Sequence, residues 1–520
     1  MTEQENQSQS LYTAAEVREL DRVAIEDYGI PGITLMRRAG RACFDRLLES
    51  WPGIRELTLF CGGGNNAGDG YVIAGLAAQR GLKVQVIWLR SPDKLQGDAL
   101  RAYRWAMQFE LSLQRFSDGT LAEGEVVVDA LLGTGLTGPV RDDFRSAIEC
   151  INASGKGVLA VDVPSGLDAD TGGVLGACVR ADVTVTFIGC KQGLMTHFGP
   201  EMTGQLLFED LAVPAEVYTH VQPSACRLQL ATQLGHLPRR NRNAHKGQHG
   251  HLLVMGGDHG MAGAVSMASE AAARVGAGLV TVVTRPEHVA PLIARRPEVM
   301  VHGVDSRQQL EPLMDRFTCI VVGPGLGRSA WSAQMLQLIL ATDLPLVVDA
   351  DALNLIAARE PMNRQDWIMT PHPGEAARLL GCQTMEIQHD RYQAVVDLQG
   401  KYGGMVLLKG AGTLLRDPAE TSLCPYGNPG MAVAGMGDVL SGVIGGLLAQ
   451  GLSLSQAAKL GVCLHSRAAD LIAAERGERG ILATDLMPEL RRLVNSQEIT
   501  PGHTEESGQR PHLHSWSTHQ

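Results

Sequence analysis

The sequence has few aromatic residues, no excess of positive charge and no long apolar run. Aromatic side chains make up 4% of the 520 residues, and the formal net charge is -11. A protein whose main ligand is nucleic acid needs a basic surface, so this balance argues against a nucleic-acid partner. A membrane-spanning helix needs about 18 or more apolar residues in a row, and the sequence contains no such run.

Paired cysteines and a leader sequence are also missing. The ten cysteines are scattered and never form a Cys-x-x-Cys pair, which argues against zinc ribbons and thioredoxin-like sites. The first residues are polar and lack the basic and apolar regions of a signal peptide. We therefore predict a cytoplasmic protein that keeps its thiols reduced and does not bind membranes.

Glycine is abundant, with 60 residues, and hydrophobic residues make up 44% of the chain. Valine-rich runs bounded by glycine or proline alternate with helical patterns, which is typical of buried parallel strands in an α/β fold. The predicted strands are 57–61, 83–89, 125–130, 157–163 and 182–188, then 251–255, 279–284, 319–322, 346–349, 367–370 and 405–409.

The length favours two or three domains. We predict an N-terminal Rossmann-like, doubly wound domain over residues 11–220 and a second α/β domain over 236–495, each with its own core. A segment with weak periodicity, 221–235, is predicted to link them. The polar ends, 1–10 and 496–520, are predicted to be disordered.

A glycine-rich loop, Cys61-Gly-Gly-Gly-Asn-Asn-Ala-Gly-Asp-Gly70, follows the first predicted strand. Its Gly62-x-Gly64-x-x-Ala67 spacing matches the dinucleotide fingerprint. That fingerprint also expects an acid at the end of the next strand, where this chain has Trp88-Leu89-Arg90. Ordinary NAD binding is therefore disfavoured.

Two further strands of the first domain end in an acidic residue near glycine. Asp129 precedes the loop Gly133-Thr-Gly-Leu-Thr-Gly-Pro139, and Asp162 precedes Ser165. Both acids could simply cap turns or helices. In a doubly wound sheet, however, such strand ends meet at one crevice, which favours a shared site.

These three motifs, in this order, resemble the epimerase domain of NAD(P)H-hydrate repair enzymes over roughly residues 10–215. The resemblance implies that Asp162 is the acid/base group and that Asn66, Asp129 and Ser165 supply oxygen ligands to a potassium ion. It also implies two segments that bind the hydrated nucleotide, which are Asn65, Asn66, Ala67, Gly68 and Asp69, and Gly133, Thr134, Gly135, Leu136, Thr137, Gly138 and Pro139.

A second glycine-rich motif, Gly435-Met-Gly437-Asp438, precedes a small-residue helical pattern. Asp438 could be a helix N-cap. Alternatively, the backbone N–H groups could stabilise a phosphoryl group while Asp438 accepts a hydroxyl proton, as in ribokinase-like enzymes. The sequence lacks Gly-x-x-x-x-Gly-Lys-Ser/Thr, which excludes a P-loop kinase.

Together with Gly256-Gly-Asp, Gly323-Pro-Gly-Leu-Gly327, Pro371-His-Pro-Gly-Glu375 and Lys409-Gly-Ala-Gly-Thr413, this motif resembles the dehydratase domain of the same family over roughly residues 235–495. The resemblance implies a ribokinase-like fold. The residues implied to contact the hydrate are Ala264, Gly325, Gly327, His372 and Asp438. Those implied to hold ADP are Lys409, Gly410, Ala411, Gly412, Thr413 and Gly437. A lone histidine such as His372 is more often structural, but its place between prolines at a strand end favours substrate contact.

The implied activity is repair of hydrated NADH and NADPH. These hydrates are NADHX and NADPHX, and each has an R and an S form. The first site would interconvert the R and S forms, and the second would dehydrate the S form at the expense of ADP, with magnesium. We also expect a homo-oligomer.

Two other functions are alternatives to this repair activity. One is a ribokinase-like small-molecule kinase with an N-terminal regulatory domain, and the other is a nucleotide sensor without turnover. The basic stretch 239–246 is either a solvated linker or, through His245 and Lys246, a support for substrate phosphates.

Overall fold

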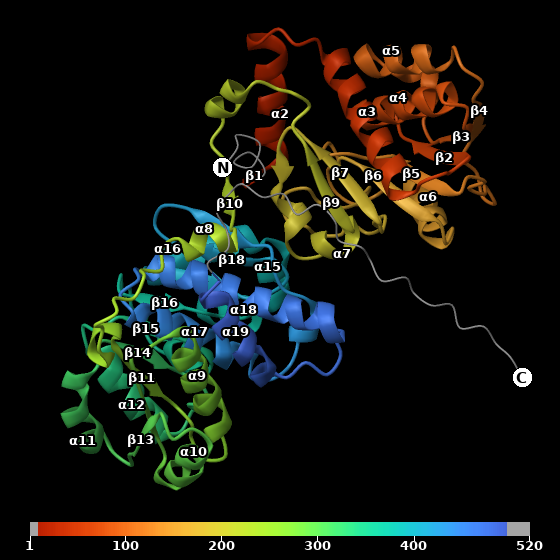
Figure 1. Cartoon of the computed structure of the whole chain (residues 1–520). Coiled ribbons are helices and arrows are strands. Elements are labelled where there is room, and N and C mark those ends of the chain that lie inside the picture. The colour runs from red at the N-terminus through yellow and green to blue at the C-terminus, as the bar shows by residue number, and fades with distance from the viewer. Residues whose placement is uncertain (1–8, 497–520) are drawn as a thin grey trace, which may run out of the picture.

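The computed structural model describes residues 9–496, which form two α/β domains joined by short strands (Figure 1). Residues 1–8 and 497–520, most of the two tails predicted to be disordered, lie outside the described residues. Ser10, placed in the first tail by the prediction, already begins β1 (Ser10–Tyr12). Within residues 9–496 no helix is both long and apolar enough to cross a membrane.

The N-terminal domain is built on a seven-stranded parallel sheet with the order β4-β3-β2-β5-β6-β7-β9. From β2 the strand order runs one way to β3 and β4 and the other way to β5, β6 and β7, as in the doubly wound Rossmann arrangement, so a crevice is expected between β2 and β5. The strand bounds are β2 Glu56–Cys61, β3 Lys83–Trp88, β4 Ser112–Arg115, β5 Val126–Ala130, β6 Gly157–Val161, β7 Val183–Phe187 and β9 Gln205–Glu209.

Helices cover both faces of this sheet. Side chains such as Leu57 and Leu59 pack under α3, α4 and α5, whereas Phe60, on the opposite face of β2, packs with α6. This division follows from the alternation of side chains along a strand. The helices are α2 Ala14–Arg22, α3 Gly32–Ser50, α4 Asn65–Gln79, α5 Gly97–Ala106, α6 Asp142–Ala153 and α7 Gly199–Thr203, with the π-turn η1 Val23–Asp27.

The C-terminal domain has a larger, mixed sheet. Seven parallel strands, in the order β13-β12-β11-β14-β15-β16-β17, continue into the antiparallel pair β18-β19. The bounds are β11 His251–Met255, β12 Leu279–Thr284, β13 Met300–Gly303, β14 Cys319–Val322, β15 Leu346–Val348, β16 Trp367–Met369, β17 Met405–Leu408, β18 Thr413–Arg416 and β19 Thr421–Cys424.

Two sets of helices bury the faces of this second sheet. One set packs with the core that contains Val254 and Val321, and its members are α9 Ala262–Val275, α17 Met436–Ala449, α18 Leu454–Arg476 and α19 Leu486–Val494. The other packs with the core that contains Leu253 and Ile320, and its members are α12 Ala330–Leu340, α13 Ala350–Ala357, α14 Pro373–Leu380, α15 Thr384–His389 and α16 Arg391–Tyr402. Shorter helices are α8 Leu230–Leu234, α10 Val289–Arg295 and α11 Arg307–Leu310.

Three short strands extend the second sheet toward the N-terminal domain. The order after β19 is β10 (Ala225–Arg227), β1 and β8 (Cys190–Lys191). Leu11, Cys190 and Ala225 are buried in the same core as Leu253. The segment 221–235, predicted as a linker, thus contains β10 and α8, and residues from the N-terminal half complete the sheet of the C-terminal half (Figure 1).

Two candidate active sites

The first candidate site is a cavity of about 1090 Å³ at the carboxyl ends of the N-terminal strands. Ten of the predicted residues line it, which are Asn65, Asn66, Asp69, Gly133, Thr134, Gly135, Leu136, Thr137, Pro139 and Asp162. Ala67 and Gly68 are buried in the first turns of α4 instead, and Gly68 lies against Met36. Gly138, Asp129 and Ser165 are not among the residues that line the cavity.

Asp162 is held at the wall of this cavity by a strained backbone and a buried cation. Its φ of 68° is unusual for a residue other than glycine. The Nζ atom of Lys191, whose side chain is 1% exposed, donates to the Asp162 carboxylate, and the Thr186 hydroxyl donates to it at 3.2 Å. The carboxylate is thus fixed in one orientation.

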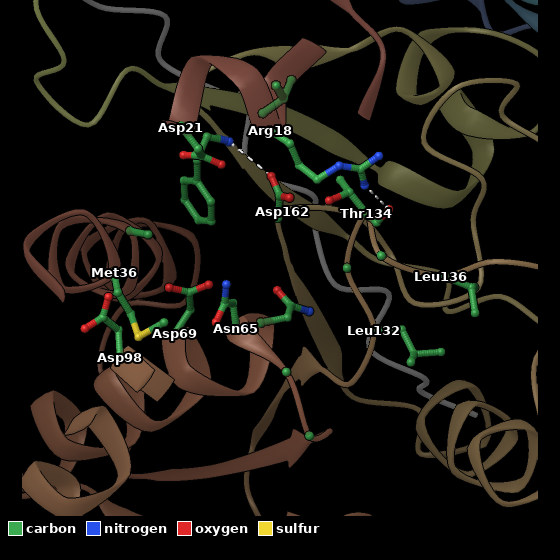
Figure 2. A pocket seen from close by; sticks show the side chains of 18 of the residues that line it. Arg18, Asp21, Met36, Asn65, Asp69, Asp98, Leu132, Thr134, Leu136 and Asp162 are labelled. Atoms are coloured by element: carbon green, nitrogen blue, oxygen red, sulfur yellow. Dashed lines mark hydrogen bonds between the residues drawn. The ribbon is translucent and has the colours of Figure 1, made fainter. Parts of the chain in front are cut away.

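Two more carboxyl groups face the same cavity. Figure 2 shows Asp69, on α4, across the cavity from Asp21, on α2, and from Asp162. Burial, with the neighbouring Asp162 and Asp21, raises the pKa of Asp69 well above its usual range. Burial raises the pKa of Asp21 to about 6, although Lys191 opposes the change. A proton can therefore reside on this cluster near neutral pH.

Asp129 and Ser165 lie together next to Leu132, a residue that lines the cavity and donates its N–H to Ser165 Oγ at 2.8 Å. The Ser165 hydroxyl donates to Asp129 Oδ1 at 2.6 Å, and the Ser165 backbone N–H donates to Oδ2 at 2.8 Å. Neither residue is exposed, and within residues 9–496 Asp129 has no ion-pair partner. Burial raises the Asp129 pKa to about 6. A buried carboxylate without a cationic side chain fits a bound cation.

The second candidate site is a hollow of about 400 Å³ at the carboxyl ends of β15, β16 and β17. Of the predicted residues, His372, Lys409, Gly437 and Asp438 line it. Gly437 and Asp438 belong to the first turn of α17, whose N-cap is Gly435 without a side-chain cap. The N–H groups of that turn are thus available to an anion at the positive end of the helix.

Charged side chains meet in this hollow. Lys409 Nζ donates to Asp349 Oδ1 at 2.7 Å and lies 4.0 Å from Glu375 Oε2. Burial disfavours the charged lysine, but Asp349 and Glu375 outweigh it and raise the Lys409 pKa. Burial and Asp349 raise the pKa of Glu375 to about 7 despite Lys409.

Asp438 is poised for proton transfer. Burial and the neighbouring Asp349 raise its pKa to about 7, with Lys409 acting in the opposite direction. A carboxylate of this basicity is well matched to a general base at neutral pH. The side chain of Asp438 also caps nothing in the structure, since α17 has no side-chain cap.

His372 is the N-cap of α14. The ring Nδ1 accepts hydrogen bonds from the backbone N–H groups of Gly374 (3.0 Å) and Glu375 (3.3 Å). The backbone N–H of His372 donates to the Glu375 carboxylate. Burial and Lys409 lower the His372 pKa, which keeps the ring neutral. The residue has the structural role that the sequence left open, and it also lines the hollow.

Ala264, Gly325 and Gly327 do not line the hollow but form a separate group around Met261. A Cβ atom on Gly325 would lie 3.0 Å from the Cβ of Ala264. The Gly327 N–H donates to Asp351 at 3.0 Å, and Asp351 also raises the Asp438 pKa. Residues 410–413 do not line the hollow; they follow Lys409 toward the N-terminal domain.

The basic stretch 239–246 lies near the amino ends of β11 and β12. Arg240 donates to the carbonyl of Gly276, just beyond the end of α9, and to Gln450 at 2.9 Å. Lys246 begins the turn that leads into the start of β11. Because both candidate sites are at carboxyl strand ends, this position does not support a role for His245 and Lys246 beside substrate phosphates.

Sequence reasoning missed Asp21, Lys191, Asp349 and Glu375 as members of the sites. Asp349 and Lys191 each come shortly after a buried strand, β15 and β7, so their position was a usable signal. Glu375 stood in the quoted motif without a role. Nothing in the sequence separates Asp21 from other helical acids.

Comparison with known proteins identifies the family of both halves of the chain. Residues 252–492 match the family model described as NAD(P)H-hydrate dehydratase, and residues 32–193 match the one described as YjeF-related protein N-terminus. The bifunctional NAD(P)H-hydrate repair enzyme of Coxiella burnetii is 52% identical to this chain and aligns with 93% of it and 99% of that protein. The enzyme of the same name from Escherichia coli is 42% identical and aligns with 96% and 97%.

A solved structure of the ADP/ATP-dependent NAD(P)H-hydrate dehydratase from Bacillus subtilis, co-crystallised with ATP/Mg2+, is 28% identical to the matching part. It covers 51% of this chain and 96% of that chain, with a TM-score of 0.47. The extent and identity of the full-length relatives decide the assignment: the chain belongs to the family of bifunctional NAD(P)H-hydrate repair enzymes.

Proposed function

We propose that the N-terminal cavity interconverts the R and S forms of hydrated NADH and NADPH, and that the C-terminal hollow dehydrates the S form at the expense of ADP. The observation that carries the second step is Asp438, with a pKa of about 7, in the first turn of α17 beside Lys409. The first step is supported by three carboxyl groups around one cavity at the topological switch of the sheet.

Epimerisation at C6 of the hydrated nicotinamide ring requires the hydroxyl group to leave and return on the other face. A carboxyl group donates a proton to the hydroxyl, the C6–O bond breaks with electrons from the ring nitrogen, and water departs. Water then adds to the opposite face and returns a proton. Asp162 is proposed as the acid/base group, and Asp69 and Asp21 as neighbours able to hold the transferred proton.

We further propose that Asn65–Asp69 and Gly133–Pro139 bind the hydrated nucleotide and that Asp129, Ser165 and Asn66 hold a potassium ion. Asp129 is buried and has no ion-pair partner among the described residues, which supports a cation at this place. The ion would neutralise Asp129 and stabilise the end of β5, from which the 133–139 loop starts.

In the C-terminal site, Asp438 would take the proton of the C6 hydroxyl as its oxygen attacks the β-phosphorus of ADP, which releases AMP. The phosphate ester then loses inorganic phosphate with electrons from the ring nitrogen, and loss of a C5 proton restores the double bond of NAD(P)H. Ala264, Gly325, Gly327 and His372 would contact the hydrate. Lys409–Thr413 and Gly437 would contact the nucleotide, and the free N–H groups of α17 would stabilise the transferring phosphoryl group.

Magnesium is expected with the nucleotide. Within residues 9–496 no three Asp, Glu, His or Cys side chains converge on a ready-made metal site. In phosphoryl transfer, magnesium is held by one or two carboxylates together with the substrate phosphates, so Asp349 and Glu375 fit this use. Bound magnesium would offset the negative charge of those phosphates.

The homo-oligomer stays a prediction, which light scattering on the purified protein would check.

The experiment that tests the proposal follows the NADH absorbance band after purified hydrate, ADP and magnesium are mixed with the protein. We expect the band to return from both epimers, with AMP and inorganic phosphate formed in equal amounts. A stable phosphorylated product without NADH would instead indicate a small-molecule kinase. A protein that binds ADP without turnover would indicate a sensor.

A further inference from the structure

A segment of the N-terminal domain supports the loop 409–413 of the C-terminal domain. After β8, residues Gln192–Met195 form the 3₁₀ turn η3, and the chain then reaches Thr196 and His197. The Thr196 hydroxyl and the His197 N–H each approach the carbonyl of Ala411 at 3.2 Å. A Cβ atom on Gly412 would lie 2.1 Å from the Met195 carbonyl oxygen, so the two backbones are in direct contact.

Arg391, the first residue of α16, lies behind the same loop. Its side chain is buried, and Nε donates to Thr196 Oγ1 at 3.0 Å. Its Nη atoms donate to the carbonyls of Leu408 (3.4 Å), Lys409 (3.4 Å) and Gly412 (3.3 Å), and to Gln388 Oε1 (2.9 Å). The guanidinium therefore joins both halves of the chain.

Within residues 9–496, Arg391 has no carboxylate partner. Two arginines that are somewhat more exposed differ in this respect, because Arg364 pairs with Asp366 at 2.6 Å and Arg285 pairs with Asp258 at 2.7 Å. Burial lowers the Arg391 pKa to about 10, so the group remains charged at neutral pH. A buried cation surrounded only by carbonyl and hydroxyl oxygens is costly unless an anion lies nearby.

The arrangement of the loop shows where such an anion fits. In a trans peptide unit the carbonyl and the N–H point in opposite directions. Carbonyls of Lys409 and Ala411 that point toward Arg391 and Thr196 therefore turn the next N–H groups, of Gly410 and Gly412, to the other side. Within the described residues the N–H groups of 410–412 donate to no protein acceptor, and Gly410 and Ala411 are exposed. Successive free N–H groups of this kind form anion sites.

We propose that Arg391 is a positioning residue for the phosphates of a nucleoside diphosphate at Lys409–Thr413, and that Thr196 of the N-terminal domain holds it in place. This inference rests on the proposed use of that loop by ADP. Arg391 acts through the loop, by aiming its N–H groups and by placing positive charge behind them. The affinity of the C-terminal site for nucleotide then depends on a side chain from the N-terminal domain.

The test compares the Kd of magnesium–ADP by titration calorimetry for full-length wild-type protein and variants. Arg391→Met should raise Kd tenfold or more, by about the worth of a charge-assisted hydrogen bond. Arg391→Lys keeps the positive charge but loses the planar guanidinium, and its Kd should lie between those of the wild type and Arg391→Met. Thr196→Val should raise Kd about threefold to tenfold, and Thr196→Ser should restore it. In dehydration assays the KM for ADP should rise more than kcat falls.

Two matched controls separate positioning from general damage. Arg364→Met removes a largely buried guanidinium that also donates to main-chain carbonyls, those of Leu340 and Thr342 instead of those of the 409–413 loop. Thr184→Val removes a buried hydroxyl whose acceptor is the Thr203 carbonyl. Both should leave the Kd for ADP unchanged.

Wild-type Kd in Arg391→Met would overturn the proposal, and wild-type Kd in Thr196→Val would overturn the part played by the N-terminal domain. If Arg391→Met does not fold, the Thr196→Val and Thr196→Ser pair decides. Wild-type protein that does not bind ADP at all would overturn the proposed function, and this inference with it.

Discussion

The Nζ atom of Lys409 lies 2.7 Å from Oδ1 of Asp349, and this pair borders the first turn of α17. The two charges act on Asp438 in opposite directions: Asp349 raises its pKa and Lys409 lowers it. With burial as the largest influence, the pKa of Asp438 is about 7. The ion pair thus helps to set how strong a base the site contains.

Asp438→Asn should stop dehydration while epimerisation continues. Loss of a general base typically lowers a rate by about 10²–10⁴, and Asp438 lies in the other domain from Asp162. The measurements are the return of the NADH band from pure S-hydrate and the interconversion of epimers by chromatography. Asp417→Asn, in the turn between β18 and β19, is the control and should keep both activities. Dehydration at the wild-type rate in Asp438→Asn would leave this residue without a catalytic role.

The dehydration rate should rise with pH through about 7. The base must be deprotonated to accept a proton, so kcat/KM falls below the pKa of Asp438 and levels off above it. Asp349→Asn removes a neighbouring negative charge and should move this limb to lower pH. Glu375 titrates in the same range, so Glu375→Gln is measured in parallel. If the pH dependence disappears in Glu375→Gln, the titrating group is Glu375 and not Asp438.

Asp162→Asn should have the opposite phenotype to Asp438→Asn. Pure S-hydrate should be repaired at the wild-type rate, whereas an epimer mixture should stall when its S form is used up. The physical reason is that the amide keeps the shape of the side chain but loses its proton transfer and its ion pair with Lys191. The initial rate of R-to-S conversion gives the measurement. Equal rates in variant and wild type would remove Asp162 from the chemistry.

Most of the architecture could be predicted from the sequence, because buried parallel strands have a strong signature. Of the six strands predicted in the C-terminal half, three have the observed bounds (β11, β12 and β14), and the other three end one residue earlier than predicted (β15, β16 and β17). In the N-terminal half the motif 65–69, predicted as a loop, forms the first turns of α4. Asparagine, aspartate and glycine are weak helix formers, and here the packing of α4 on the sheet outweighs that preference.

The contact between the halves could not be predicted. β1, β8 and β10 are two or three residues long, too short to show a period. Their pairing depends on residues far apart in the sequence, such as Leu11 with Ala225 (214 positions) and with Cys190 (179 positions). The side chains that act on Asp162 and Asp438 could not be identified from the sequence either. They come from distant parts of the chain, and local spacing says nothing about which distant residues the fold brings together.

Asp129→Asn should remove any dependence of the N-terminal domain on potassium. Burial raises the Asp129 pKa from 3.8 to about 6. An acid with a raised pKa in the folded state costs stability as pH rises from 3.8 to 6, by up to about 3 kcal/mol. Without potassium at pH 7.5 the variant should therefore be more stable than the wild type, whereas below pH 4 the two should be equal.

Potassium should remove the difference in stability between wild type and Asp129→Asn at pH 7.5, because the ion pairs with the charge of Asp129 in the wild type. Urea unfolding in potassium and in tetramethylammonium buffers provides the measurement, with Ser165→Ala as a variant that keeps the charge. A potassium effect of equal size in wild type and Asp129→Asn would place the ion elsewhere.

Separating the halves tests how far each works alone. Each has its own sheet, and none of the described residues beyond Leu211 lines the N-terminal cavity, so a fragment 1–221 should keep epimerase activity. A fragment 222–520 retains β10 and α8 but lacks Thr196, the acceptor for Arg391. It should fold and dehydrate the S-hydrate, with a KM for ADP about tenfold above that of the intact chain.

Adding fragment 1–221 to fragment 222–520 should restore the KM, because β1 can pair again with β10 and Thr196 can return to Arg391. The same fragment with Thr196→Val should associate but not restore it, since the strand pairing is kept and only the hydroxyl is lost. The quantity to measure is the ADP concentration that gives half-maximal dehydration, with and without each added fragment. A C-terminal fragment with the KM of the intact chain would show that the loop 409–413 needs no support from the N-terminal domain.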